Sequence, residues 1–387
     1  AELAKKLGSS YGVDAFRAKT GLPPSTYFSG PKVRWLLDSR SDLKARANSG
    51  ELAFGTIDAW LAYKLTGRHV TDVTNASRTM LMDIETLQWD EDLCEVIHVP
   101  ESMLPEIVPS SGVIAPCTGV LEGTVLAAML GDQHAALVGQ AGFDPGDTKV
   151  TYGTGAFLVS NTGTEIISSN AGLLTTVGYQ LAGEPAVYAL EGSVAVAGSA
   201  VQWLRDNIGL ISDAPEIEAL AMSVQDNGDV YFVPAFSGLF APYWRDDARG
   251  VFTGLTRFSR KGHLGRAVLE ATAFQARDVL AAMAEDTGSS LSEIRVDGGM
   301  VANTLLMRFQ ADILDMDVIV PSIVETTVLG AAFGAGMATG MWSGPEDVRA
   351  HWQEAVRYTP SMSDSKRSKL LHGWSKAVER SLGWIED

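Results

Sequence analysis

Three short segments of the chain combine a polar side chain with glycines, as do sites that hold hydroxyl groups or phosphates. They are Gly131-Asp132-Gln133, Tyr152-Gly153-Thr154-Gly155 and Asp297-Gly298-Gly299. A carboxylate can accept a hydroxyl proton or meet a metal ion, and glycines let a phosphate approach the backbone closely. Each segment also fits an ordinary structural role, because aspartate is a preferred helix N-cap and glycines are common in tight turns.

Two well-known nucleotide and hydrolase motifs do not occur in the sequence. It contains no GxxxxGK[ST] and no HExxH pattern. The glycine-rich run 330–336 falls within an expected helix, so we interpret it as a packing surface and not as a dinucleotide loop. The six histidines lack metal-ligand spacing, and we interpret them as surface or capping residues. Any chemistry is therefore expected at the three glycine-containing segments.

The length and charge of the chain limit its function. At about 150 residues per domain, 387 residues predict two domains. The formal net charge of −17 argues against nucleic acid and against an anionic membrane surface as partners, because both need a basic face. A nucleotide is still compatible with this charge, since a local site and Mg²⁺ hold it.

Neither the cysteines nor the apolar runs indicate an extracellular or membrane protein. Cys94 and Cys117 form no pair with metal-ligand spacing, which predicts reduced thiols in a cytoplasmic protein. The longest weakly polar run, Thr326–Trp342, is short and rich in small residues. It predicts a close-packed helix inside a domain and not a membrane span.

Each of the three segments follows or joins expected strands. Thr124–Leu130 has the length and composition of a buried strand and leads into Asp132. Residues 149–152 and 156–161 flank the Gly153-Thr154-Gly155 turn as a hairpin, and Ile294–Val296 leads into Asp297. Ligands of α/β proteins gather beyond the carboxyl ends of strands, which places Gly131-Asp132-Gln133 where a site is expected.

The remaining pattern predicts an α/β protein of two domains. Residues 1–120 read as helices and loops, whereas strands and helices alternate after the turn Pro145-Gly146-Asp147. We therefore predict domains at 1–144 and 145–387. Further elements of the second domain are strands at Val187–Leu190, Val230–Val233 and Val318–Val320, a long helix from Lys261 to about Glu285, and helices that end near Leu204 or begin at Ala302 and Thr326.

With these segments in this order, the chain resembles the FGGY carbohydrate kinases, and within them the glycerol kinases. The resemblance covers essentially the whole chain. It also includes Tyr27-Phe28-Ser29-Gly30-Pro31-Lys32, Phe54-Gly55-Thr56-Ile57-Asp58, Thr74-Asn75-Ala76-Ser77-Arg78-Thr79-Met80, Gly172-Leu173-Leu174-Thr175-Thr176 and Ala241-Pro242-Tyr243-Trp244. It implies a ribonuclease H-like, actin- or hexokinase-type fold, in which a nucleotide cleft lies between two domains.

The resemblance also assigns roles to single residues. Asp132 is implied as the general base for a glycerol hydroxyl. The implied glycerol-binding residues are Tyr27, Asp132, Gln133 and Phe157. The implied ATP-binding residues are Thr154, Gly198, Gln202, Gly299 and Asn303. ATP and Mg²⁺ are the implied cofactors, no residue is assigned to the metal, and a homo-oligomer is a further expectation.

The sequence departs from the family pattern in several places. His134 stands where glutamine is common, and Phe240 stands where a glycine is usual. The family's first strand, its DxGT-type phosphate loop, its Arg-Glu pair and a substrate-binding tryptophan have no counterpart. By resemblance, roughly a hundred N-terminal residues are missing, about half of a typical domain. The first domain is then expected to be incomplete, to expose strand edges and apolar surface, and to leave the chain inactive by itself.

Two other functions stay open from the sequence. One is an FGGY kinase for another polyol or a pentulose, because the absent Arg-Glu pair and tryptophan select the substrate. The other is a non-catalytic, actin-like nucleotide-binding protein. A small-molecule pocket built from Tyr27, Phe157 and the Asp132-Gln133 pair disfavours the second.

Overall fold

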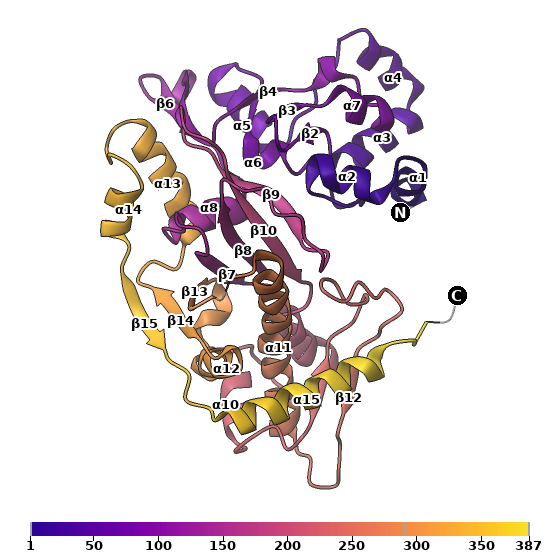
Figure 1. Ribbon diagram of the computed structural model, residues 1–387, viewed down its shortest axis with the longest axis vertical. Helices are drawn as coiled ribbons and strands as arrows, with labels where there is room; N and C mark the ends of the chain where they lie inside the picture. The colour runs from indigo at the N-terminus through magenta and orange to yellow at the C-terminus, as the bar shows by residue number, and fades with distance from the viewer. Residues whose placement is uncertain (1, 290, 386–387) are drawn as a thin grey trace.

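A mixed seven-stranded sheet forms the centre of the C-terminal part (Figure 1). The computed structural model describes residues 2–289 and 291–385. The strand order is β15-β14-β13-β7-β8-β10-β9, with β7, β13 and β14 parallel and the other neighbours antiparallel. The bounds are β7 (Thr148–Tyr152), β8 (Ala156–Gly163), β9 (Leu174–Tyr179), β10 (Val187–Val194), β13 (Glu293–Asp297), β14 (Asp317–Pro321) and β15 (Glu354–Tyr358).

Most of the predicted elements of the second domain are confirmed. β7 and β8 form the predicted hairpin, with Tyr152 opposite Ala156. The long helix is α11 (Lys261–Thr287), and the strand predicted at Val230–Val233 is β11 (Tyr231–Val233), which pairs with β12 (Val251–Thr253) outside the main sheet. The sequence did not predict β9 or β15. In β15 every residue but the last is exposed, so no buried apolar alternation marks it.

The helix predicted from Ala302 begins two residues later. Residues Gly299–Ala302 form a 3₁₀ turn, and Asn303 then caps α12 (Thr304–Leu314) because its Oδ1 accepts the Leu306 N–H at 2.8 Å. The extra turn keeps the backbone after Asp297 close to the sheet edge before the helix starts.

Two helical layers cover opposite faces of the sheet. Val150 and Tyr152 of β7 face the larger core, to which α9 (Gly198–Trp203), α10 (Glu216–Met222), α11, α12 and α15 (Asp364–Ser381) contribute. Val159 of β8 faces a smaller core with α8 (Asp132–Gly139), α13 (Thr326–Ala338) and α14 (Pro345–His351). Since side chains alternate along a strand, Lys149 and Thr151 point away from the larger core and toward α8.

Glycines let α8 and α13 pack backbone to backbone. A Cβ atom added to Gly330 would lie 1.7 Å from the Ala135 carbonyl oxygen, and one added to Gly139 would lie 1.9 Å from the Thr326 carbonyl oxygen. The interpretation of the run 330–336 as a packing surface is therefore confirmed, and so is the close-packed helix predicted from Thr326.

The N-terminal part is helical with short strand pairs, and it lies beyond the β9 edge of the sheet (Figure 1). The strand pairs are β1 (Val70–Asp72) with β4 (Glu106–Val108), β2 (Met82–Asp83) with β3 (Gln88–Trp89), and β5 (Ser111–Pro116) with β6 (Val125–Ala128). The helices are α1 (Glu2–Tyr11), α2 (Val13–Thr20), α3 (Ser29–Ser39), α4 (Ser41–Asn48), α5 (Ile57–Thr66), α6 (Val73–Ala76) and α7 (Glu91–Ile97).

The short strands correct two expectations for this part. Residues 1–120 are not only helices and loops, because short strands pair there over two or three positions. The strand predicted at Thr124–Leu130 exists as β6 but is not buried, and Val125 is 43% exposed. Its sheet has two strands, so β6 has a strand partner on one edge only. The outer side of α5 is apolar and exposed, with Ile57 at 86%, Trp60 at 61% and Leu61 at 54%.

The turn at Pro145-Gly146-Asp147 connects α8 to β7. The smaller core crosses it, because Leu137 and Phe143 pack with Val159 and Phe333. The division at residues 144 and 145 therefore stays a prediction, and in this core the two sides pack as one body.

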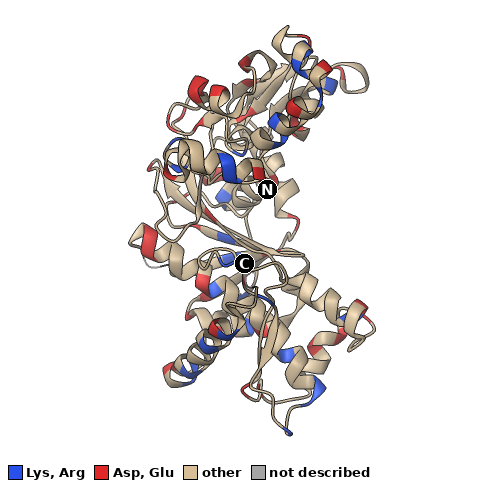
Figure 2. Ribbon diagram, turned by 90° about the vertical axis from the view of Figure 1, so that its right-hand side faces the viewer, with Lys and Arg blue, Asp and Glu red and all other residues tan. Residues whose placement is uncertain are grey.

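In the view of Figure 2, Lys and Arg residues and Asp and Glu residues are spread over both parts of the chain. No helix in the described part of the chain combines the length and the apolar character that a membrane crossing requires.

We expect Gly330→Ala to destabilise the protein. The added methyl group would force α13 away from α8, and overpacking of this kind costs about 1–3 kcal/mol, more than the roughly 1 kcal/mol that alanine gains in a helix. Urea unfolding measures the change. Ala332→Ser, on the exposed side of the same helix, is the control and should stay within about 0.5 kcal/mol of the parent. Equal stability of Gly330→Ala and the parent would contradict the close helix contact.

Candidate active site

Three backbone turns meet at the carboxyl end of β7. Thr151 of β7 lies beside Asp297 of the parallel strand β13, so the turns that follow both strands are neighbours. Gly298 has a φ of +90°, and a Cβ atom there would lie 2.4 Å from the Tyr152 carbonyl oxygen. The third turn precedes α9, where the Gly198 N–H donates to the Gly153 carbonyl oxygen at 3.0 Å. Only residues without a Cβ atom allow this approach.

A cavity of about 360 Å³ opens beside these turns. All five residues that the resemblance assigned to ATP line it, although they come from three separate segments. They are Thr154, Gly198, Gln202, Gly299 and Asn303. Gln202 lies one helical turn after Gly198 on α9, and Asn303 is the cap of α12. The structure brings these residues together, and their contact with a nucleotide stays a prediction.

Some residues that line this cavity were not predicted from the sequence. Ile217 and Glu218 of α10 line it, together with Met300. Glu218 holds α10 against α12, because its Oε1 accepts the Thr304 hydroxyl at 2.6 Å and the Leu305 N–H at 3.0 Å. The helix has only seven residues and no glycine motif, so no local signal placed it near Thr154.

A second cavity, of about 780 Å³, lies next to the first. Tyr27 and Phe157, two of the residues predicted to bind glycerol, line it, and Thr154 lines both cavities. Three charged residues in its lining, Arg17, Arg78 and Glu191, had no predicted role. The Arg78 Nη2 group donates to Glu191 Oε1 at 2.9 Å, and Glu191 is buried.

The departure at Phe240 also lies in the wall of this second cavity. Its ring stacks on Trp244, with ring centroids 6.2 Å apart. The larger side chain therefore becomes part of the lining.

Asp132 and Gln133 line neither cavity. They are the first two residues of α8, and Asp132 is exposed. Gly131 is the cap residue of this helix, so Asp132 does not have the N-cap role that was its structural alternative. The Asp132 Oδ1 atom accepts the backbone N–H of Gln133 at 2.8 Å, which turns the carboxylate to the start of the helix.

Buried hydrogen bonds from the N-terminal part hold the start of α8. The Gly131 N–H donates to Thr74 Oγ1 at 2.9 Å, and that hydroxyl donates to Asp72 Oδ2 at 2.8 Å. Asp72 is fully buried and also accepts the Ser110 hydroxyl at 2.7 Å. The segment Thr74–Met80, which carried part of the resemblance, therefore supports the turn that presents Asp132.

Lys149 links the Asp132-Gln133 segment to the sheet. Its wholly buried Nζ donates to Gln133 Oε1 and, at 3.0 Å, to Thr151 Oγ1. Burial lowers the pKa of Lys149 to about 8, and the carboxylates of Asp297, Glu191 and Asp132 act in the opposite direction. Sequence reasoning missed Lys149, although a lysine inside a predicted strand of a packed domain is an unusual residue to bury.

The interpretation of the histidines is wrong for His134. This residue is buried behind Asp132, and its Nε2 lies 3.3 Å from Thr176 Oγ1. Burial, together with the nearby charges of Arg78 and Lys149, lowers its pKa to about 3. The ring is therefore neutral. His263 does cap a helix as expected, because its Nδ1 accepts the Arg260 N–H at 2.9 Å.

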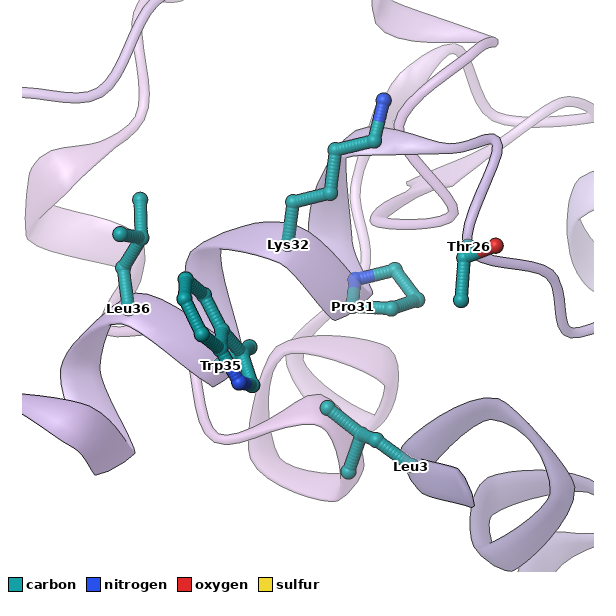
Figure 3. A pocket seen from close by; sticks show the side chains of 6 residues that line it. All are labelled: Leu3, Thr26, Pro31, Lys32, Trp35 and Leu36. Atoms are coloured by element: carbon teal, nitrogen blue, oxygen red, sulfur yellow. The ribbon is translucent and has the colours of Figure 1, made fainter. Parts of the chain in front are cut away.

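A separate cavity of about 460 Å³ lies among α1 and α3 (Figure 3). Leu3, Pro31, Trp35 and Leu36 make it mostly apolar. The Lys32 side chain extends away from Leu3 and Trp35, and its Nζ donates to the Tyr27 carbonyl oxygen at 2.9 Å. This cavity contains none of the predicted site residues.

Within residues 2–289 and 291–385, no group of three or more His, Cys, Asp or Glu side chains is arranged to hold a metal ion. Mg²⁺ in kinases does not require such a group, because one or two carboxylates and the substrate phosphates bind it. Asp132 is an exposed carboxylate at the site that could take part.

Two family profiles match the chain. The N-terminal domain of the FGGY family of carbohydrate kinases matches residues 1–139, and the C-terminal domain of the same family matches residues 148–339. The chain belongs to the FGGY family of carbohydrate kinases. Among its FGGY relatives, glycerol kinase of Chloroflexus aggregans is 56% identical over 100% of the chain and 78% of the relative. Glycerol kinase of Nocardia farcinica is 58% identical over 99% of the chain and 78% of the relative.

Solved structures confirm the predicted two-domain α/β kinase fold for this FGGY chain. The crystal structure of Plasmodium falciparum glycerol kinase with ADP superposes with a TM-score of 0.94 at 39% identity, over 100% of the chain and 78% of that protein. The gluconate kinase of Lactobacillus acidophilus superposes with a TM-score of 0.86 at 21% identity, over 98% of the chain and 76% of that protein. The second likeness shows the fold alone.

We expect the free energy of unfolding of His134→Gln to fall less steeply with decreasing pH than that of the parent. The unfolded chain protonates this histidine below about pH 6.5, whereas the folded protein resists protonation down to about pH 3. Stability is therefore present above pH 6.5 and falls as the pH drops, by about 1.4 kcal/mol per pH unit for one proton. Urea unfolding between pH 6.5 and 4.5 measures this slope. His372→Gln, at an exposed position, should keep the parent slope. An unchanged slope in His134→Gln would contradict a neutral, buried ring.

Proposed function

We propose that this protein is a glycerol kinase, which transfers the γ-phosphoryl group of ATP to glycerol and releases glycerol 3-phosphate and ADP. The observation that carries the proposal is the gathering of Thr154, Gly198, Gln202, Gly299 and Asn303 around one cavity, next to a cavity lined by Tyr27 and Phe157. The names of the relatives support the acceptor, because glycerol kinases match the whole chain at 56% identity.

The first cavity takes the nucleotide in this proposal. Its apolar wall of Ile217 and Met300 suits a flat base, and the backbone around Thr154 and Gly299 suits phosphates that need close approach. Mg²⁺, when bound with the nucleotide, would supply positive charge to the phosphate oxygens. We place the nucleotide on the side of residues 145–387 and glycerol on the side of residues 1–144.

Asp132 acts on the acceptor hydroxyl in this proposal. In a loose phosphoryl-transfer transition state the nucleophile loses its proton late, so a carboxylate can orient the hydroxyl and take the proton as it becomes acidic. Gln133, Tyr27 and Phe157 would bind the rest of glycerol. Closure of the two parts would exclude water and limit hydrolysis of ATP. We further propose a cytoplasmic location and a homo-oligomer, on family resemblance alone.

A second candidate is a kinase of the same family for a larger polyol or a pentulose. The second cavity, of about 780 Å³, supports this candidate, because that space admits a substrate larger than glycerol. An acceptor panel separates the two candidates.

An ADP-release assay with ATP, Mg²⁺ and glycerol tests the proposal. It should be run on the complete translation product of the gene and on the 387-residue chain, with pentuloses and other polyols as rival acceptors. Glycerol-dependent turnover with a kcat/KM above that of every rival supports the proposal. Well-folded protein that prefers a pentulose, or that releases no ADP with glycerol, would overturn it.

Asp132→Asn is expected to lower kcat for glycerol about 10²–10⁴-fold, the usual range for a lost general base. The nucleotide dissociation constant should change little, because Asp132 lies outside the cavity assigned to ATP. Steady-state kinetics and calorimetric titration with ADP measure the two effects. Asp42→Asn, on the exposed surface of α4, is the control and should keep the parent kcat. Normal turnover by Asp132→Asn would remove this residue from the mechanism.

A further inference from the structure

Lys149 directs a buried positive charge at the residue next to Asp132. Its Nζ donates to Gln133 Oε1 and to Thr151 Oγ1, and none of its surface is exposed. A lone buried charge is costly, so such a lysine is retained where it is hydrogen-bonded and paired. No carboxylate forms a salt bridge with Lys149 among the described residues, and its contacts are an amide oxygen and a hydroxyl. The contact with Gln133 therefore calls for an explanation beyond stability.

The chemistry of the two groups settles which way the Gln133 amide lies. An ammonium group carries three donors and no acceptor, so only the oxygen of an amide can face it. The two donors of the Gln133 nitrogen must then point away from Lys149. With the opposite rotamer, the amide nitrogen would face the ammonium group, which is both a lost hydrogen bond and a repulsion.

This orientation makes Asp132 and Gln133 a complementary pair. The ionised Asp132 carboxylate only accepts hydrogen bonds, whereas the outward side of the Gln133 amide only donates them. An alcohol hydroxyl both donates and accepts. At the start of α8, Asp132 can therefore accept a hydrogen bond from one hydroxyl. Gln133 can donate a hydrogen bond to the oxygen of the same hydroxyl or of the adjacent one.

We propose that Lys149 is a positioning residue of the kinase, which holds the Gln133 amide so that its nitrogen donates to a hydroxyl oxygen of the acceptor. The inference rests on the proposed function, since it assumes an acceptor with neighbouring hydroxyls. It assigns to Lys149 a part in acceptor specificity, although this residue does not itself touch the acceptor.

The surroundings fix the Lys149 ammonium group from several sides. β7 lies between β8 and β13, so the backbone of Lys149 cannot shift without breaking both strand pairings. The charged groups that face it are Asp297 of β13, Glu191 of β10 and Asp132 of α8. His134 lies close enough for Lys149 to lower its pKa, and this histidine is neutral. The lysine is thus held in place by the sheet and not by Gln133 alone.

A double-mutant cycle tests the assignment. Lys149→Met, Gln133→Leu and the double variant are compared for KM, kcat and kcat/KM with glycerol. If Lys149 acts through Gln133, each single variant lowers kcat/KM about tenfold or more, chiefly by raising KM. The kcat/KM of the double variant is then no lower than that of the less active single variant. If the two single effects multiply in the double variant, Lys149 acts independently and the proposal fails.

Acceptor analogues give a readout that a purely structural role would not change. Propane-1,2-diol and propane-1,3-diol each lack one hydroxyl of glycerol. One of these diols lacks the hydroxyl that Gln133 binds. With that diol, the kcat/KM of the parent divided by the kcat/KM of Lys149→Met should fall toward one. The same loss of activity with glycerol and both diols would contradict the proposal. Val150→Ala, on the neighbouring residue that faces the larger core, is the control, and it should lose stability without changing KM for glycerol.

Gln133→Glu keeps the test decisive if Lys149→Met fails to fold. It leaves an oxygen facing Lys149 and replaces the outward donor with a second acceptor, so the fold should persist while KM for glycerol rises about tenfold or more. A normal KM would overturn the proposal.

The proposed function can fail separately from this inference. If the parent protein releases no ADP with glycerol, the proposed function is wrong, and the orientation of Gln133 is then tested by thermal unfolding. If the shifts in Tm of Lys149→Met and Gln133→Leu are clearly non-additive in the double variant, the contact is confirmed, and additive shifts in Tm overturn it.

Discussion

The position of β7 between β8 and β13 is the constraint on which the site depends. The carboxyl ends of β7 and of the parallel strand β13 lie side by side, so the glycine turns that follow the two strands are neighbours. The turn at Gly198 is the third turn at this place, because its N–H donates to the Gly153 carbonyl oxygen. The two faces of β7 are also distinct. Val150 and Tyr152 belong to the larger core, whereas Lys149 and Thr151 face α8. One short strand thus supports the cavity assigned to the nucleotide and the segment assigned to the acceptor.

The second anchor of the site is α8, which is held from three directions. Glycines bring α13 against its back, Lys149 reaches its first turn from the sheet, and Thr74 binds the N–H of Gly131 from the N-terminal part. Asp132 is exposed at the point where these contacts converge. Rigid support from several elements is what a group needs if it must meet a hydroxyl and a phosphoryl group in line.

Burial of polar groups concentrates behind this exposed carboxylate. His134 is kept neutral, the pKa of Lys149 is lowered to about 8, and the Asp72 oxygens accept hydrogen bonds from hydroxyls and backbone N–H groups. Such groups cost free energy to bury and are common where a protein must fix the orientation of a reacting group. The Lys149–Gln133 contact fits this pattern, because it uses a buried charge to orient an amide.

The sequence by itself determined the family, the hairpin around Gly153-Thr154-Gly155, the long helix α11 and the packing role of the run 330–336. These features depend on local patterns: glycines at turns, apolar periodicity and short motifs in a given order. The tertiary structure alone decided that β6 is only partly buried, that His134 is buried, that α10 lines the first cavity and that Lys149 reaches Gln133. Those facts depend on contacts between residues far apart in the chain, and burial and pKa follow from such contacts, which no local pattern encodes.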